Sequence, residues 1–397
     1  MIPHLRSEFN RAVTPESHRR FLADLDRRCG THVKFRICET PCFFPASLLD
    51  ELAAIGAELL RQLVESREYH AASGAAVPPA FNVPRETPHP LFAAVDFGLV
   101  RAADGRLEPK LVEIQGFPSL YAFQVAFAEQ YVETYRLDPA LRIVPGGVDL
   151  DAYNRALRRA ILGAHAAENV VLMEFDPLEQ KTLPDFLLTE RVCGIRTVNV
   201  RDIIKEGSRL FYTRDGKRVP IRRIYNRAIV DELVRKQVKL PFDFRDDLDV
   251  EWAGHPNWFF RISKFSIPHL RHACVPKTWF LDELPEWPGD LENYVLKPLY
   301  SFAGIGVIVG PARADLEAVP AAERHNFILQ ERLAFEPIIE TPHGPTKAEI
   351  RILYIWLDQM HLGPAIIRMG RGKMMGVDHN RDMEWVGASA GLIAAGS

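Results

Sequence analysis

The chain has 397 residues, of which 47% are hydrophobic and 25% charged, a composition typical of a globular protein. Its 49 Lys and Arg against 52 Asp and Glu give a net charge of −3, which argues against nucleic acids or anionic membranes as general partners. No apolar run reaches the roughly 18–20 residues of a membrane helix, and no signal-peptide core follows Met1. Five cysteines without a Cys-x-x-Cys pair exclude a disulfide scaffold and a zinc ribbon. We therefore expect a cytoplasmic protein of two or three domains.

Residues 1–80 are predicted to be helical. The segment Ser47-Leu-Leu-Asp50 has the pattern of a capping box. Leucines then recur at helical spacing, at Leu49, Leu52, Leu59, Leu60 and Leu63. Between Ser73 and Pro90, repeated prolines predict a loop. The sequence gives this segment no function beyond packing on the rest of the chain.

Two strands and a helix are predicted after that loop. Leu91–Arg101 and Lys110–Ile114 have the composition of strands, and Asp104-Gly105 between them predicts a hairpin turn. Pro118 then precedes a helical pattern that continues to Tyr135.

Helix and strand patterns alternate between residues 150 and 240. Helices are expected at 151–167 and 183–193, with strands at 170–175, 196–200, 210–213 and 222–225. This alternation with short connections predicts a small parallel-sheet unit. Asp215-Gly216 separates the last two strands. A loop-rich stretch follows at 240–260, and short strands with glycine turns predominate after it.

A lysine followed by a glycine loop is the first candidate binding motif. The predicted strand Tyr294-Val-Leu-Lys297 leads into a small-residue loop with Gly304 and Gly306. Glycines let backbone N–H groups approach an anion, and the lysine adds a positive charge for a phosphate. The Gly-Lys-Ser/Thr of a P-loop is absent. A simple hairpin with a surface lysine is an equally good interpretation of this motif alone.

A second motif is Phe327-Ile-Leu-Gln330-Glu331-Arg-Leu333. The end of this short apolar strand offers hydrogen bonds suited to an adenine edge, with Leu333 packing on the ring. Taken alone, the motif is more typical of a strand that meets water through its polar residues.

Three oxygen-bearing side chains form the candidate metal site. Glu113 and Gln115 are two apart on one predicted strand, so their side chains point to the same face. Asp96 lies on the neighbouring strand and can join them. Such ligands suit Mg²⁺, which also accepts waters and substrate phosphates. Ordinary polar residues on an exposed hairpin face are the alternative.

Cations are scattered along the second half of the chain. Lys264, Arg351 and Arg368 lie in or at the ends of predicted strands, and Arg368 precedes the basic glycine loop Gly370–Lys373. Arginine forks suit phosphate and carboxylate oxygens. Each of these residues alone is more typical of a solvated surface charge. A role in binding can therefore be inferred only from all the motifs considered together.

Together these segments resemble the ATP-grasp ligases, and more narrowly the circularly permuted branch typified by the synthetase domain of glutathionylspermidine synthetase. Eukaryotic glutathione synthetase is a more distant relative of that branch. The matching segments run in order from about residue 90 to the C-terminus: Asp96-Phe-Gly, Lys110 to Leu120, residues 170–227, Ser263-Lys264, Tyr294–Val307, Ile328–Arg332, and Ile366-Ile-Arg368 through Asn380. No motif is specific alone, and the assignment rests on their collinear order.

The resemblance implies an α/β (α+β) ATP-grasp fold with a small parallel-sheet insert domain, similar to a pre-ATP-grasp domain. It also implies a division of the chain into four parts. These are a helical N-terminal segment (1–80), the metal-binding part of the core (81–149), a parallel α/β substrate-side domain (150–250), and the nucleotide-binding subdomains (251–397).

The resemblance also implies roles for the matched residues. One or two Mg²⁺ ions would be held by Asp96, Glu113 and Gln115. Arg368 would stabilise charge during phosphoryl transfer, and Arg351 would face the reacting carboxylate. ATP would be bound by Lys264, Lys297, the loop residues Ser301, Phe302, Ala303, Gly304 and Gly306, and the adenine-side residues Gln330, Glu331, Leu333 and Glu336.

The sequence departs from the family pattern at several positions. The metal-binding Asn of the family is Gln115 here, and the Arg two positions before the metal Asp is Ala94. One phosphate clamp of the family is therefore either missing or supplied elsewhere in the chain, with Arg85 as the candidate. The Tyr-Pro-Trp-Glu that forms a substrate wall in the family is Tyr225-Asn-Arg-Ala. The acceptor site is therefore expected to be built from residues 200–240 and the loop Arg371–Lys373.

These features favour an ATP- and Mg²⁺-dependent carboxylate–amine ligase that forms an amide through an acyl phosphate, with amino-acid or peptide-like substrates. A small-molecule kinase shares the same nucleotide site. A non-catalytic nucleotide-binding or partner-binding module is the third interpretation, which Gln115 and Ala94 favour. His361 and His379 are expected to be structural, and the sequence predicts no oligomeric state.

Overall fold

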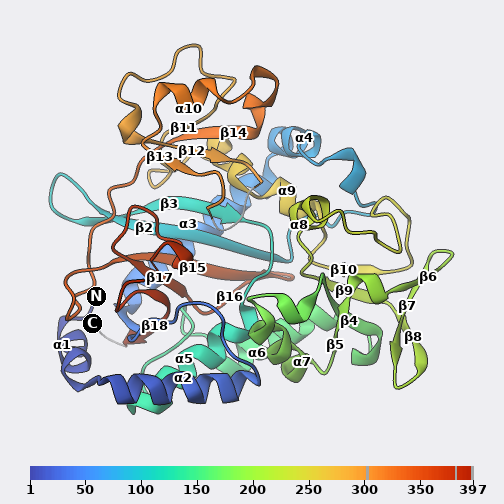
Figure 1. Ribbon diagram of the computed structural model, residues 1–397, viewed down its shortest axis with the longest axis horizontal. Coiled ribbons are helices and arrows are strands. Elements are labelled where there is room, and N and C mark those ends of the chain that lie inside the picture. The colour runs from blue at the N-terminus through green and yellow to red at the C-terminus, as the bar shows by residue number, and fades with distance from the viewer. Residues whose placement is uncertain (301–303, 381, 395–397) are drawn as a thin grey trace.

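The computed structural model describes residues 1–300, 304–380 and 382–394. Four sheets make up the fold (Figure 1). The largest lies at the centre, with a parallel sheet to one side and a small antiparallel sheet above it. A three-stranded hairpin unit extends beyond the parallel sheet.

The central sheet joins strands from both ends of the chain. Its order is β1-β18-β17-β15-β2-β3, with the short β16 also paired to β15. All its pairings are antiparallel except that of β1 with β18. The strands are β1 (Cys42–Pro45), β2 (Phe92–Arg101), β3 (Leu107–Gln115), β15 (Lys347–Trp356), β16 (Met360–Leu362), β17 (Ile366–Gly370) and β18 (Gly387–Ala394).

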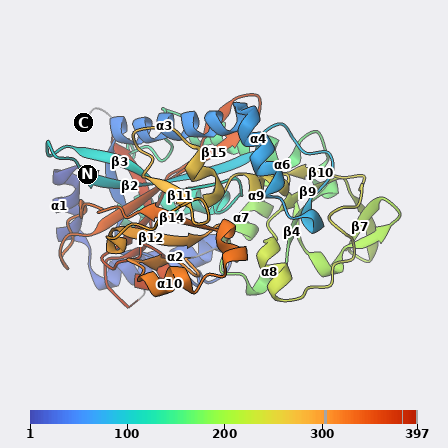
Figure 2. The ribbon, with the colours of Figure 1, turned by 90° about the horizontal axis from the view of Figure 1, so that it is seen from above.

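Helices cover both faces of the central sheet, and the alternation of side chains along β2 shows how. Phe92 and Ala94 belong to the core beneath α2 (Pro15–Cys29) and α5 (Tyr121–Tyr135), whereas Ala93 and Val95 belong to the core beneath α3 (Ala46–Glu65). Figure 2 shows α3 and α2 on opposite sides of this sheet. Asp96 lies two residues after Ala94 and therefore on the same face of β2, the one beneath α2 and α5. On this face a charged residue follows the apolar ones.

The parallel sheet has the order β10-β9-β4-β5. Its strands are β4 (Val170–Glu174), β5 (Arg196–Asn199), β9 (Arg223–Asn226) and β10 (Glu251–Ala253). The adjoining antiparallel unit consists of β6 (Ile204–Glu206), β7 (Arg209–Arg214) and β8 (Lys217–Ile221). Since Val171, Ile224 and Leu210 share one apolar core, the two units pack as one body.

The fourth sheet has the order β11-β14-β12-β13 and is antiparallel. Its strands are β11 (Thr278–Phe280), β12 (Tyr294–Pro298), β13 (Ile308–Val309) and β14 (Phe327–Glu331). Leu296 and Leu329 lie in its own small core, beneath α10 (Arg313–Glu317).

The remaining helices are α1 (Pro3–Ala12), α4 (Arg67–Ala75), α6 (Leu150–Leu162), α7 (Leu183–Cys193), α8 (Val230–Arg235) and α9 (Asn257–Arg261). Short 3-10 helices connect them at η1 (Pro79–Phe81), η2 (Ala167–Asn169), η3 (Pro177–Glu179), η4 (Val200–Asp202), η5 (Lys264–His269), η6 (Leu291–Asn293), η7 (Ala321–Asn326) and η8 (Val377–Asn380). Among the described residues, none of these helices combines the length and apolarity needed to cross a membrane.

The structure confirms most of the expected elements and corrects three details. The N-terminal segment is not wholly helical, because β1 lies within it. The predicted capping box at Ser47 is wrong, since α3 begins at Ala46 after Pro45 and has no side-chain cap. The Asp215-Gly216 turn connects β7 to the unexpected strand β8, because Lys217–Ile221 returns along β7 before the chain enters β9.

Candidate functional site

Strand register brings four charged side chains together on one face of the central sheet. Arg351 on β15 lies opposite Asp96 on β2, and Arg368 on β17 lies opposite Glu349 on β15. Arg351 holds Asp96 through two hydrogen bonds, Nε to Oδ1 at 2.6 Å and Nη2 to Oδ2 at 2.7 Å. Arg368 donates from Nη2 to Asp96 Oδ2 at 2.8 Å, and its Nη1 lies 2.6 Å from Glu349 Oε1. The four groups therefore form a continuous chain of alternating charge.

Burial and charge act in opposite directions on these carboxylates. Burial alone would raise the pKa of Asp96, but the charges of Arg351 and Arg368 outweigh it and keep that pKa below its usual value. Burial raises the pKa of Glu349, and the charges of Arg368 and Arg351 only partly oppose the shift. Asp96 is thus held ionised by two cations, whereas Glu349 has weaker support.

Two lysines approach the adjacent strand β3. Lys264 Nζ, at the start of η5, lies 3.2 Å from Glu113 Oε1. Lys297 Nζ, on β12, donates to the backbone oxygen of Val112 at 3.2 Å and to the side-chain oxygen of Gln330 on β14. Burial lowers the pKa of Lys297 to about 8, with Glu113 opposing the shift and Lys264 adding to it.

A small cavity lies beside Lys264. It is lined by Glu113, Gln115, Phe117, Phe259, Ile262, Ser263, Lys264, Leu299 and Tyr300. Gly116 lets the chain after β3 approach α9 closely, because a Cβ there would lie 2.4 Å from the backbone oxygen of Trp258. The end of β3 and helix α9 therefore form two of its walls.

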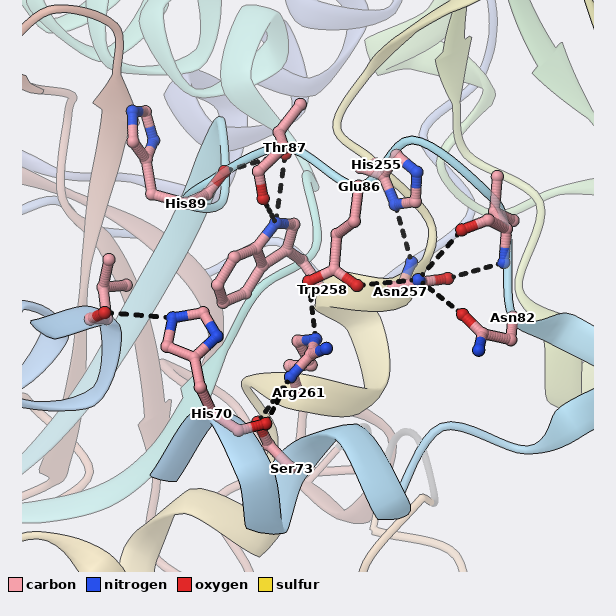
Figure 3. Close-up of polar contacts among 12 residues, drawn as sticks. His70, Ser73, Asn82, Glu86, Thr87, His89, His255, Asn257, Trp258 and Arg261 are labelled. Carbon is pink, nitrogen blue, oxygen red and sulfur yellow. Dashed lines mark hydrogen bonds and ion pairs between the residues drawn. The ribbon is translucent and has the colours of Figure 1, made fainter. Parts of the chain in front are cut away.

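A polar network fixes α9 behind the cavity (Figure 3). The Asn257 side chain accepts from the backbone N–H of Val83 at 2.9 Å and donates to the Glu86 carboxylate at 2.8 Å. Arg261 Nε lies 2.6 Å from Glu86 Oε1, and its Nη1 donates to the Ser73 hydroxyl at 2.9 Å. These contacts tie the helix that precedes Lys264 to α4 and to the proline-rich loop before β2.

The structure brings six of the predicted site residues into two neighbouring groups. Asp96, Arg351 and Arg368 form the first, and Glu113, Gln115 and Lys264 form the second around the cavity. Lys297 contacts β3 at Val112, three residues before Gln115, and it also binds the side chain of Gln330. On the adenine side, Glu331 is exposed, and Leu333 follows it in the same segment.

Other predicted residues have different partners or lie elsewhere. Glu336 accepts from Arg101 Nη2 at 2.7 Å, at the far end of β2. Arg85, the candidate for the missing clamp of the family, instead pairs with Asp247 at 2.9 Å. Ser301, Phe302 and Ala303 lie outside the described residues. Gly304 and Gly306 both have positive φ, and Gly304 faces Met374 and His379.

Sequence reasoning missed two contributions to this region. Glu349 was not predicted, although its period-two spacing from Arg351 places both side chains on the same face of a strand. The aromatic residues that line the cavity, Phe117, Phe259 and Tyr300, were also not predicted. Their local sequence is the same as that of ordinary core residues.

Within the described residues, no three His, Cys, Asp or Glu side chains gather as metal ligands would. The predicted metal set includes an amide, Gln115, and only two carboxylates. Of these, Asp96 already has both oxygens on guanidinium groups, whereas Glu113 and Gln115 both face the cavity.

Comparison with known proteins adds a fold relationship. No protein-family model and no curated protein matches the chain. A solved structure of a glutathione synthetase-like effector (GSS30) from Globodera pallida, in its apo form, is similar with a TM-score of 0.60. The alignment covers 96% of this chain and 98% of that chain at 11% sequence identity. The protein therefore has a mixed α/β fold similar to that of a glutathione synthetase-like protein.

Proposed function

We propose that the protein is an ATP- and Mg²⁺-dependent carboxylate–amine ligase with an ATP-grasp fold. The observation that carries the proposal is the convergence of Lys264, Lys297, Arg351 and Arg368 on one region of the central sheet. These cations come from η5, β12, β15 and β17, and they meet carboxylates of β2 and β3 next to a cavity. Such a concentration of positive charge suits a polyphosphate and a second anionic substrate.

The region next to Lys297 is suited to the nucleotide base. Gln330 is 2% exposed, and its amide nitrogen has no hydrogen-bond partner among the described residues. An unpaired buried donor is costly unless a ligand satisfies it, and an adenine ring nitrogen is a suitable acceptor. Lys297 beside it supplies a positive charge for the phosphates.

The donor set also fits Mg²⁺ in a limited way. Mg²⁺ is commonly bound by one or two carboxylates and completes its shell with waters and substrate phosphates. Glu113 and Gln115 would hold it at the cavity, and Asp96 would join them only after releasing its arginines. When bound, Mg²⁺ supplies neutralising charge to the phosphates of ATP.

The reaction needs positioning and charge neutralisation more than an acid–base residue. The substrate carboxylate attacks the γ-phosphorus of ATP, giving an acyl phosphate and ADP. The amine then attacks the acyl carbon, loses a proton and expels phosphate. Arg351 and Arg368 would stabilise the transferring phosphoryl group, with Asp96 and Glu349 holding their guanidinium planes in place.

Calorimetric titration of ATP, with and without Mg²⁺, tests the nucleotide site. We expect metal-dependent binding by the wild type, loss of binding in Lys297→Ala, and unchanged binding in Lys205→Ala, which removes an exposed lysine of β6. Release of ADP with mixed amines and carboxylates then tests the ligase. A stable phosphorylated product without an amide would assign the kinase activity instead, and no ATP binding by the wild type would contradict the whole proposal.

A non-catalytic nucleotide- or partner-binding module is the second candidate. The pairing of Asp96 with two arginines favours it. Both oxygens of this predicted metal ligand are occupied by arginines, and Gln115 and Ala94 depart from the family pattern. A Glu113→Gln variant separates the candidates. If the variant keeps the full cellular phenotype, the module is supported. If the variant loses both the phenotype and the release of ADP, the enzyme is supported.

A further inference from the structure

We propose that Cys38, Cys42 and Met369 bind a single Cu(I) ion near the edge of the central sheet. The proposal goes beyond the proposed function and does not depend on it. The Sγ atoms of both cysteines lie 3.5 Å from the Sδ atom of Met369, and all three side chains are completely buried. We call these three residues the sulfur cluster. Thiolate and thioether sulfurs are the ligands that select Cu(I) among the metals common in proteins.

The order of strands in the central sheet brings the sulfur atoms together. Cys42 lies on β1 and Met369 on β17, with β18 between them. Ile393 of β18 shares a core with both residues, so Gly391 and Ser389, two and four positions earlier, lie on the same face of the sheet. Because these two residues are small, side chains from the strands on either side can meet above β18. The third sulfur comes from the segment just before β1.

A buried cation beside the sulfur cluster lacks a counter-charge. Arg6 is 2% exposed, and its Nη1 donates to the backbone oxygen of Pro41 at 3.0 Å. Among the described residues, its Nε and Nη2 atoms have no hydrogen-bond partner, and no carboxylate forms an ion pair with it. Burial lowers the pKa of Arg6, and the thiolates of Cys42 and Cys38 are the nearby anions that would oppose the shift. An unpaired buried charge is costly. Two thiolates and one Cu(I) ion carry one net negative charge, which the guanidinium of Arg6 neutralises.

Binding of the metal requires loss of two protons and a small movement of the sulfurs. Burial raises the pKa of Cys42 to about 12, whereas Arg6 and the Ser389 side chain favour its thiolate. When Cu(I) binds, both thiols release their protons, three bonds form between sulfur and metal, and no electron is transferred. With metal–sulfur bonds of about 2.3 Å, the sulfurs of a trigonal site lie about 4 Å apart. The two contacts with Met369 must therefore lengthen by about half an ångström, and the flexible thioether side chain permits this movement.

Anaerobic loading with Cu(I) in the presence of excess bicinchoninate, a chelator of Cu(I), tests the site. Because the sulfur cluster is closed to solvent, the metal is offered both to the native protein and to the whole chain during refolding. We expect one Cu(I) ion per chain to be retained. Cys38→Ala and Cys42→Ala should each weaken the affinity at least about tenfold. Cys193→Ala, which removes a buried thiol of α7, is the matched control and should change nothing. Retention of no copper by either sample, or equal losses in all three variants, would overturn the proposal.

X-ray absorption at the copper edge gives the number of sulfur ligands. We expect three sulfurs in the wild type and two in Met369→Leu, an exchange of similar volume that the core tolerates. A Cu(I) ion that stabilises the folded state should also raise the melting temperature of the wild type and not that of Cys42→Ala. The same sulfur count in wild type and Met369→Leu would contradict the assignment of Met369.

Substitution of the buried cation tests the argument from charge. Arg6→Met keeps an apolar side chain of similar length but removes the guanidinium, and we expect the affinity for Cu(I) to fall by about tenfold or more. Arg11→Met, at the exposed end of the same helix α1, is the control and should leave the affinity unchanged. Circular dichroism of both variants verifies that they fold. Equal affinities of the Arg6 variant and the wild type would overturn the role of Arg6 as the counter-charge of the site.

Discussion

Lys297 carries an amine that is buried between two strands and lies close to a second lysine. Burial lowers its pKa to about 8, and Lys264 adds to the shift. An ordinary lysine stays charged to above pH 10. The proposed phosphate contact is therefore lost in a range of pH that is easily reached in an experiment.

We predict that ATP binding weakens as pH rises through about 8. Below that pH Lys297 is protonated in the free protein; above it, binding must first take up a proton, and each further unit of pH weakens the affinity by up to about tenfold. Calorimetry between pH 7 and 9 measures the effect. Lys297→Arg, which stays charged, should flatten the profile. A wild-type affinity constant over this range would contradict the prediction.

Arg368 is predicted to act on the chemical step. Its two Nη atoms reach two different carboxylates, Asp96 and Glu349, so its plane is fixed on the site face. Arg368→Lys keeps the charge but loses this planar fork, and we expect kcat to fall by about 100-fold with little change in ATP affinity. Steady-state kinetics and ATP titration measure the two quantities. Arg313→Lys, in an exposed pair with Glu317, is the control; equal effects of both substitutions would refute this role.

At the scale of residues, the sequence predicted which charged side chains belong to the candidate site. It did not predict which of them form ion pairs with one another. Asp96, Arg351 and Arg368 stood out because each interrupts an apolar strand. Asp96 and Arg351 are 255 residues apart, and their contact depends on the register of β2 against β15. No local pattern encodes that register, so the mutual neutralisation of these groups emerged only from the fold.

At the scale of elements, α5 shows how one helix depends on another. Its N-terminal residue Leu120 has a left-handed conformation and supplies no side-chain cap. Asp185 of α7 supplies it instead, accepting from the backbone N–H groups of Leu120, Ala122 and Phe123 at 3.0–3.1 Å. The same carboxylate pairs with Arg227 at 2.5 Å, and both side chains are almost completely buried.

We predict that Asp185→Asn lowers the free energy of unfolding by about 3–5 kcal/mol, because it leaves the Arg227 charge buried and unpaired. Urea unfolding measures the loss. The double variant Asp185→Asn, Arg227→Met removes the unpaired buried charge. It should therefore recover part of the lost free energy of unfolding. A double variant no more stable than the single one would show that the cap, rather than the ion pair, is the main contribution.

Helices and strands whose ends are marked by residues nearby in the sequence were predictable. Elements that depend on pairing with a distant segment were not. The helix expected at 183–193 matches α7, which ends at Gly194 in a left-handed conformation. By contrast, β1 has only four residues, follows Pro41 and ends at Pro45, and its burial shows no alternation. Its strand conformation depends on pairing with β18, which lies at the other end of the sequence.

At the scale of the whole molecule, stability should depend on the protonation of Glu174. Burial at the end of β4 raises the pKa of this carboxyl to about 8; Arg227 and Lys236 oppose the shift, and Glu232 adds to it. Between about pH 4.5 and 8 the folded protein keeps this proton while the unfolded chain loses it. Stability is therefore lost progressively as pH rises across that window.

We expect Glu174→Gln to raise the melting temperature by about 2 °C or more at pH 8 and to change it less at pH 5. The amide removes the ionisation and retains an oxygen to accept from the backbone N–H of Phe175. Thermal unfolding at the two pH values gives the comparison. Glu317→Gln, on the exposed helix α10, controls for the loss of one negative charge. An identical shift at both pH values would contradict the assignment.

The mixed α/β character of the fold was predictable from the order of the motifs. A glutathione synthetase-like structure aligns over nearly the full length at 11% identity, and the ATP-grasp assignment stays a prediction. Core positions tolerate exchange of one apolar residue for another of similar size. Most sequence similarity is thus erased while the layers persist, and the precise ligand contacts cannot be inferred from the fold.

The pairing of β1 with β18 has a consequence for synthesis. β1 contributes Phe43 and Phe44 to the two cores, yet the strand that it pairs with contains residues 387–394. At roughly 5–20 residues per second, a ribosome needs on the order of 20–70 seconds to make the intervening chain. During that interval this aromatic segment has no partner strand. The central sheet therefore cannot be completed before β18 has been made, and until then β1 is an apolar strand without its partner.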